Sequence, residues 1–161
     1  MKIKVATLGE NHPETANSYE GLGGAYHSKG DVDRAIEYYE RDLKITVATV
    51  GENHPSTANS YNNLGLAYRC KGDSDRAIEY YERDLKITVA TLGENHPDTA
   101  ASYNNLGNAY DDKGDYDRAI EYHEKALHIF MATVGLNHPD TELVQRSLDE
   151  AKTKKQPQQT P

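Results

Sequence analysis

The pentapeptide Gly-Glu-Asn-His-Pro recurs along the chain at a fixed step of 42 residues. It occupies Gly9–Pro13, Gly51–Pro55 and Gly93–Pro97, and a variant with Leu in second place follows at Gly135–Pro139. The 42-residue segment that begins at Val5 differs from the next segment at 8 positions, and that segment differs from the third at 12. Repetition of this kind predicts stacked supersecondary units without one central core, because each unit buries its apolar face against its neighbours.

Two amphipathic helices are predicted in every unit. In the first unit, Pro13 suits the first helical position, with the His or the Asn before it as the cap, and the helix is predicted to run to Lys29. A Gly-Asp pair at Gly30 then ends this helix, called helix A, and caps the next, called helix B. Helix B keeps one apolar stripe as far as Val50, and Gly51 is expected to end it in the left-handed conformation. The predicted class is therefore all-α.

The residues of the second unit resemble the tetratricopeptide repeat (TPR) signature. They are the run Tyr61–Tyr68, the pair Gly72-Asp73, the run Ala77–Tyr81 and Leu85. Ordinary TPR units have about 34 residues, and the longer step, with His-Pro before helix A, is similar to the repeats of kinesin light chains and of TPR sensor regions attached to signalling ATPases. The resemblance covers Val5 to about Lys152. It implies a right-handed α-α superhelix, or solenoid, that holds proteins and catalyses nothing.

The repeat boundaries predict the organisation of the whole chain. Lys2–Leu8 matches the end of helix B at Lys86–Leu92, so the first residues are interpreted as a truncated helix B. Near the other end, alignment of Pro139 with Pro97 places Asp149 at the position of Gly107, the glycine that allows a helix B to pack. No further helix B is expected there, and the last helix is predicted to cap the array. The predicted segments are a truncated helix at 1–8, repeats at 9–50, 51–92 and 93–134, a capping helix at 135–152 and a disordered tail at 153–161.

Charge and cysteine content narrow the class of partner. The chain has 26 acidic and 18 basic residues, for a net charge of -8, which disfavours a nucleic-acid partner. No apolar run approaches the roughly 18 residues of a membrane span. The single cysteine, Cys70, cannot form a disulfide within the chain and fits a reducing cytoplasm. A cytoplasmic protein without a nucleic-acid or membrane partner is therefore expected.

No constellation typical of an enzyme is found. The histidines before the prolines recur once per 42 residues, too far apart to share a metal, so they are interpreted as helix caps. Cys70 has no base nearby in the sequence. His123 replaces a core Tyr and is expected to be packed in the core, and the acids Asp42 and Asp84 should find a buried donor such as a Tyr hydroxyl. No catalytic residue, metal or cofactor is predicted.

The differences between repeats indicate where a partner could bind. Five of the 8 differences between the first two units fall between residues 20 and 28 of helix A, and positions 20, 24 and 27 share one helical face. Such variation is typical of a surface that acquires specificity, and equally of an exposed face without constraint. The TPR resemblance implies that ligands lie along the concave helix-A face. The candidate peptide-binding residues are Asn17, Glu20, Gly24, His27, Asn59, Asn62, Asn63, Leu66, Arg69, Asn104, Asn105, Asn108 and Asp111.

The chemistry of these residues favours a peptide or protein ligand. The amides can each donate and accept hydrogen bonds, as the backbone of an extended peptide requires. Glu20 and Asp111 replace the basic residues with which chaperone-tail TPR domains hold a carboxylate, so such a tail is disfavoured. Asp111 and Asp112 instead suggest a partner with basic character. The alternative is a structural array in which copies of the chain stack end to end through the truncated helix.

Overall fold

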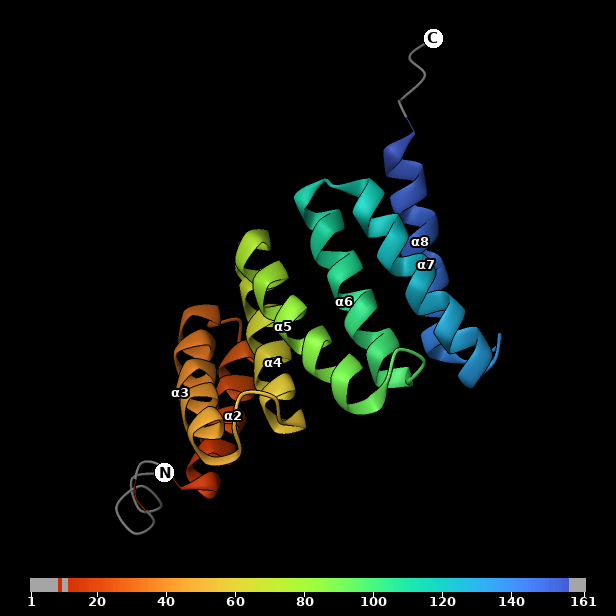
Figure 1. Ribbon diagram of the computed structural model, residues 1–161. Helices are drawn as coiled ribbons and strands as arrows, with labels where there is room; N and C mark the ends of the chain where they lie inside the picture. Colours follow the sequence, from red (N-terminus) through yellow and green to blue (C-terminus); the bar gives the residue numbers. More distant parts are fainter. Residues whose placement is uncertain (1–8, 10–11, 157–161) are drawn as a thin grey trace. The chain divides into compact units, whose positions relative to one another are not determined.

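The computed structural model describes Gly9 and residues 12–156, which form seven α-helices and no β-strand (Figure 1). The helices are α2 (Pro13–Ser28), α3 (Val32–Val50), α4 (Pro55–Lys71), α5 (Ser74–Leu92), α6 (Pro97–Lys113), α7 (Tyr116–Thr133) and α8 (Pro139–Lys155). The even-numbered helices are the A helices of the repeats and the odd-numbered ones the B helices. The chain forms two compact units, residues 1–87 and 88–161, with the division inside α5. The predicted all-α class built from helix-turn-helix repeats is confirmed.

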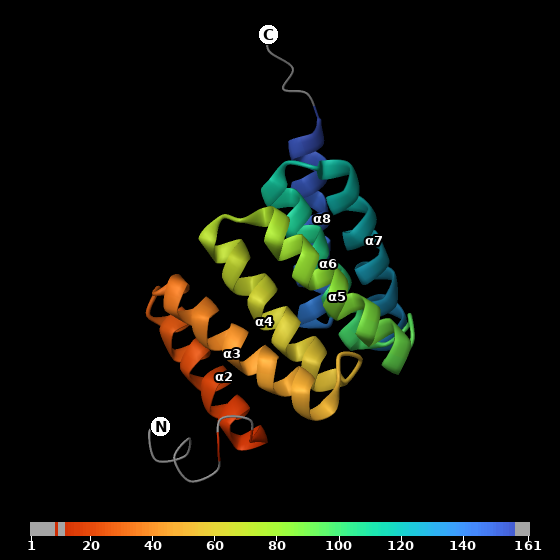
Figure 2. The same cartoon turned by 60° about the vertical axis from the view of Figure 1, so that its left-hand side comes forward.

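In the first unit α3 packs on both α2 and α4, and the three helices lie side by side in two views (Figures 1 and 2). Glycine makes the close approach of helices A and B possible. A Cβ atom added at Gly23 would lie 2.5 Å from the ring of Tyr39, and one at Gly65 would lie 2.6 Å from the ring of Tyr81. The mid-helix glycines therefore give room for an aromatic ring, which compensates for their poor helix propensity of about 1 kcal/mol relative to Ala.

In the second unit α7 packs on both α6 and α8. The side chains of Ile129 and Phe130 on α7 form a core cluster with Ala100 of α6 and Val144 of α8. Gly107 faces His123, which is 1% exposed and so lies in the core as predicted. Helix α8 thus closes the apolar face of α7 through Val144, Leu148 and Ala151, which are all buried.

Tyrosine rings fill the seam between the helices of a repeat. Tyr38 of α3 stacks between Tyr19 and Tyr26 of α2, with centroid distances of 6.0 and 5.4 Å. The guanidinium of Arg34 lies 5.3 Å above the ring of Tyr26. Equivalent tyrosine triplets recur in the other repeats, where every pair is stacked except Tyr61 with Tyr80, which is tilted. The rings bury their faces while their hydroxyls remain at the edge, so a chain without Trp and with one Phe can still build its seams.

Histidine caps every described A helix. Nδ1 of His54 accepts a hydrogen bond from the backbone N–H of Ser56 at 3.1 Å, and the histidines before α2, α6 and α8 do the same. The predicted capping role is confirmed. The Thr two residues after each Pro adds a second constraint, since the Thr57 hydroxyl donates to the carbonyl of Gly51 at 2.7 Å. The repeated pentapeptide is thus a turn that fixes the entry of helix A.

The end of helix B differs from the prediction. Gly51 has φ 93° and ψ 167°, which is an extended conformation at positive φ and not the left-handed helical one. The left-handed helical conformation occurs instead after helix A, at Gly72 and Gly114. Both regions are open mainly to glycine. The longer turn of the pentapeptide needs an extended exit, whereas the A–B turn is tight.

Helix α8 is longer than predicted and ends at Lys155. Its last turn is held by ion pairs to the two preceding helices: Lys152 to Glu124 at 2.9 Å, Lys155 to Asp117 at 2.5 Å, and Lys154 to Asp111. Leu143 of this helix is 50% exposed, so it lies outside the face that covers α7. The predicted truncated helix at 1–8 and the last five residues of the predicted tail lie outside the described residues.

A buried acid is held by a serine and a threonine, not by the tyrosine hydroxyl that the sequence suggested. The Ser60 hydroxyl donates to Oδ2 of Asp42 at 2.6 Å, and the Thr46 hydroxyl donates to Oδ1 at 3.3 Å. Burial raises the pKa of the Asp42 carboxyl, and the hydrogen bond from Ser60 opposes that rise. The acid therefore serves the packing of α3 on α4.

Candidate peptide-binding face

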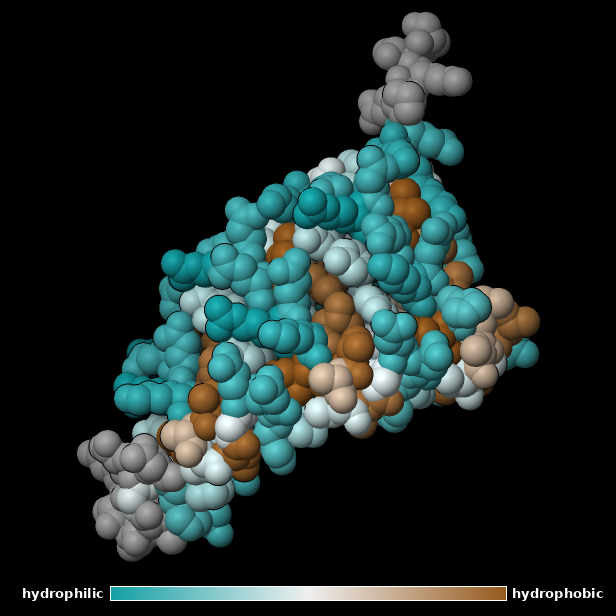
Figure 3. All heavy atoms as spheres, in the orientation of Figure 1, coloured by the Kyte–Doolittle hydropathy of each residue, from teal (hydrophilic) through white to brown (hydrophobic). Residues whose placement is uncertain are grey.

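The first unit presents most of the predicted residues at its surface. On α2, Asn17 and Glu20 are exposed, and Gly24 and His27 are half-buried. On α4, Asn59 and Leu66 are exposed, and Asn62, Asn63 and Arg69 are half-buried. In the view of Figure 3, polar side chains cover most of the molecular surface, and apolar atoms lie in narrow patches between them. Leu66 is one of the few large apolar side chains of the first unit that are exposed.

Side chains of neighbouring A helices pair with one another across this face. Nδ2 of Asn63 donates to Oε1 of Glu20 at 3.3 Å. Nε2 of His27 lies 3.3 Å from Sγ of Cys70. Each pair joins residues 43 positions apart. The structure thus brings the predicted residues Asn63 and Glu20 together. It also gives Cys70 a neighbouring base, His27, which could not be inferred from the local sequence because it comes from the preceding repeat.

The second unit has an equivalent pair, which is formed by an acidic and a basic side chain. Asp111 of α6 forms an ion pair with Lys154 of α8, again 43 positions later. The Asp111 side chain is 17% exposed, and its Oδ1 atom has no hydrogen-bond donor within the described part of the chain. Asn105 and Asn108 are half-buried on the same helix. Because Lys154 neutralises Asp111, the expectation of a basic partner for this face loses its main support.

Asn104 does not belong to the exposed face. It is 8% exposed, and its Oδ1 lies 3.0 Å from Nδ1 of His123. The physical reason is the replacement of the core Tyr by His123, because a buried ring nitrogen requires a polar partner. The structure thus places the Asn104 amide in the interior, away from the exposed residues predicted for this face.

The described residues carry hydrogen-bonding and charged groups but no cluster suited to a metal: no group of three or more His, Cys, Asp or Glu side chains is placed to hold an ion. No described helix has the length and apolar character needed to cross a bilayer. What the face offers is a set of amides, carboxylates and one apolar side chain, which can form hydrogen bonds and hydrophobic contacts with another chain.

The helix pairs, the histidine caps and the Gly–aromatic contacts define a helical repeat protein of helix-turn-helix units. Family models described as tetratricopeptide repeat match residues 1–46, 26–88 and 99–140. The chain belongs to the TPR family. Repeats of this family generally serve as protein–protein interaction scaffolds.

Solved structures of kinesin light chain-like proteins are similar to this chain. BtubC (BKLC) from P. vanneervenii shares 30% identity with a TM-score of 0.81, and the match covers 88% of this chain and 57% of that one. The putative kinesin light chain of Podosopora anserina, with nearly identical TPR-like repeats, shares 31% identity with a TM-score of 0.81, and the match covers 89% of this chain and 68% of that one. The predicted kinesin light chain-type resemblance is confirmed.

The fold extends beyond these relatives. The apo form of RapI has a TM-score of 0.82 at 21% identity, over 95% of this chain and 53% of that one, which shows a shared fold alone. No curated protein matches the chain. The matched part of this chain corresponds to 57% of the length of BtubC.

Proposed function

We propose that the chain is a non-enzymatic scaffold that binds an extended peptide or protein segment on its helix-A face. In the first unit this face consists of the exposed sides of α2 and α4. The single cysteine and the absence of a nucleotide-binding or metal motif in the sequence are consistent with a cytoplasmic protein that acts by binding.

The arrangement of three side chains on α4 carries the proposal. Asn59, Asn63 and Leu66 follow the i, i+4, i+7 spacing and therefore lie along one face of the helix. Asn59 is exposed, and its side chain forms no hydrogen bond with the residues that the structure describes. Leu66 is 36% exposed. The stripe offers the amide group of Asn59 and the amide oxygen of Asn63 to a peptide backbone, and an apolar contact to one of its side chains.

Glu20 and Asn17 extend the stripe onto α2. The hydrogen bond from Asn63 to Glu20 holds the two A helices together and orients both side chains. A ligand that crosses from α2 to α4 would therefore meet polar groups already held in place, which lowers the entropic cost of binding. Such a ligand is expected to be extended, with hydrogen bonds from its backbone and one apolar anchor.

The third repeat supplies variants that the fold tolerates. Ala101 and Asn108 occupy the positions of Asn59 and Leu66, so Asn59→Ala and Leu66→Asn should fold normally. We expect peptides selected from a random library against the wild-type chain to bind the double variant at least about tenfold more weakly. The measurement is fluorescence polarisation with each selected peptide.

A matched control comes from the following helix. Lys86→His also copies the third repeat, at His128, and lies on α5 at an exposed position outside the helix-A face. This variant should retain full binding. Selected peptides that bind the Asn59→Ala, Leu66→Asn variant as tightly as wild type would show that the helix-A face of the first unit is not the site.

End-to-end self-association is the alternative function. It was predicted to use residues 1–8, which lie outside the described part of the chain. Sedimentation velocity over a wide concentration range separates the two functions, because a chain that stays monomeric at its highest concentration is not a self-assembling array.

A further inference from the structure

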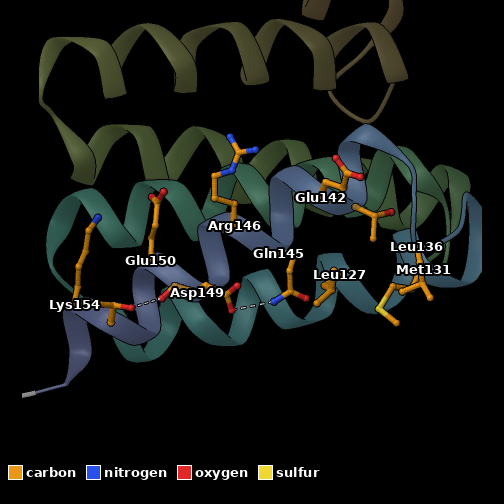
Figure 4. A pocket seen from close by; sticks show the side chains of 11 residues that line it. Leu127, Met131, Leu136, Glu142, Gln145, Arg146, Asp149, Glu150 and Lys154 are labelled. Carbon is orange, nitrogen blue, oxygen red and sulfur yellow. Dashed lines mark hydrogen bonds between the residues drawn. The ribbon is translucent and has the colours of Figure 1, made fainter.

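A groove with a volume of about 670 Å³ lies along the last two helices of the second unit (Figure 4). Leu127 and Met131 of α7 line one side together with Leu136 from the turn that follows, and Gln145 and Asp149 of α8 line the other. Met131 is 44% exposed and Leu136 66% exposed. Two large apolar side chains are thus open to water beside a row of polar ones.

The first unit shows what occupies the corresponding groove there. Leu43 of α3 and Tyr61 of α4 stand two repeats before Leu127 and Gln145. Between them packs α5, whose Ile87 forms a buried cluster with Ala58 and Tyr61, and Leu43 packs against that cluster. The space between a helix B and the following helix A is therefore shaped for another helix.

The groove of the second unit has changed its chemistry at three positions. Glu142, Gln145 and Asp149 replace the Ala58, Tyr61 and Gly65 positions of α4. Gly65 gives room to the aromatic ring of Tyr81, whereas a carboxylate now stands at that point. An occupant with an aromatic ring there would clash with Asp149 and bury its charge, so the fitting side chain is a short or a basic one.

The charges that line this groove are mainly acidic and are not all neutralised. Lys154 forms an ion pair with Asp111, and the Gln145 side chain donates a hydrogen bond to Asp149 at 3.0 Å. Of the other charged residues that line the groove, Glu142, Asp149 and Glu150 are acidic and Arg146 is basic. A basic occupant complements this charge, while the apolar floor requires aliphatic side chains.

We propose that this groove docks an amphipathic helix of another protein that carries Lys or Arg beside an aliphatic stripe. The aliphatic stripe packs on Leu127, Met131 and Leu136, and the basic side chains pair with the carboxylates of α8. The site is separate from the helix-A face of α2 and α4, so the proposed peptide binding there does not depend on it.

A helix of this chain provides the probe. A labelled peptide with the sequence of residues 74–92 carrying Tyr81→Lys brings a lysine to the point that faces Asp149. We expect this peptide to bind the full chain, and Asp149→Lys to weaken binding at least about tenfold. Asp149→Gly restores the glycine of the other repeats and should reverse the preference, so that the unsubstituted peptide binds more tightly than the lysine peptide.

Controls separate the groove from other surfaces. Glu121→Lys makes the same charge reversal on an exposed position of α7 outside the groove and should leave binding unchanged. Leu66→Asn should also have no effect, which distinguishes this site from the helix-A face. Absence of binding, or binding that ignores Asp149→Lys, would overturn the proposal. Self-association of the chain that Met131→Asp abolishes would make the occupant a second copy and overturn it as well.

Discussion

The hydroxyl of Ser60 on α4 donates a 2.6 Å hydrogen bond to the carboxylate of Asp42 on α3, and both side chains are buried. Two repeats later Val144 and Ala126 occupy the same two positions, again buried and packed in one apolar cluster. The seam between a helix B and the following helix A is thus packed either by a hydrogen-bonded Asp–Ser pair or by an apolar Ala–Val pair. In both cases the two residues of the pair must match.

Combining one residue of the polar pair with one residue of the apolar pair should destabilise the chain. Ser60→Val leaves Asp42 with only the hydroxyl of Thr46, and we expect a loss of about 1–3 kcal/mol in the free energy of unfolding. Adding Asp42→Ala completes the apolar pair and should recover at least half of that loss. Urea unfolding followed by circular dichroism measures both. Strictly additive losses would show that the two positions do not act as a pair.

The raised pKa of Asp42 predicts a specific pH dependence. Burial favours its protonated form in the folded chain, so the stability linked to this proton is present below the unfolded pKa of about 3.9 and is lost as the pH rises through the raised folded pKa. Asp42→Asn cannot titrate and keeps an acceptor for Ser60. As the pH falls from about 7 to about 4, the wild-type chain should therefore gain free energy of unfolding relative to this variant. A difference that is constant with pH contradicts the assignment.

Two glycines of α2 should respond oppositely to alanine. Gly23→Ala places a methyl group against the ring of Tyr39 and should cost about 1–3 kcal/mol even after the gain in helix propensity. Gly21→Ala meets nothing within 4 Å and should stabilise the chain by about 0.5–1 kcal/mol. Thermal or urea unfolding of both variants provides the test, and equal effects would mean that Gly23 is not required for packing.

The lysines at the end of α8 should differ in importance. Lys154 pairs with Asp111, whose side chain is 17% exposed, and Lys155 pairs with Asp117, whose side chain is 76% exposed. Lys154→Ala leaves a partly buried carboxylate unpaired and should cost about 1 kcal/mol or more, whereas Lys155→Ala should cost less than about 0.5 kcal/mol. Comparable losses from the two variants would show that the exposure of the partner is unimportant here.

The helices could be predicted closely from the sequence because their limits depend on local chemistry. Pro13 and its equivalents begin the A helices, and Gly72 and Gly114 follow the ends of α4 and α6, because the fixed φ of Pro and the freedom of Gly act within a few residues. The conformation of Gly51 was less predictable, since its φ is set by the residue but its ψ by the longer turn.

The contacts across the helix-A face could not be predicted in the same way. They depend on which side chains of two neighbouring helices meet, and the repeat aligns residues 42 apart whereas the contacts join residues 43 apart. One signal was available for the seam between a helix B and the following helix A: Asp84 with Ser102 changes to Ala126 with Val144 in a single step, which indicates contact. The burial of Asn104 similarly accompanies the change from Tyr to His123.

The 43-residue spacing of those contacts limits how an array of such units can gain or lose members. Deleting residues 51–92 would preserve every cap, turn and glycine contact of the remaining repeats, because those features recur every 42 residues. Yet the deletion would set Asp112 opposite His27 in place of Cys70. Duplication or deletion of a whole unit therefore keeps the caps, turns and glycine contacts. It changes the pairs of surface residues that meet where the new neighbours join. A change in the number of units therefore also changes the chemistry of the helix-A face.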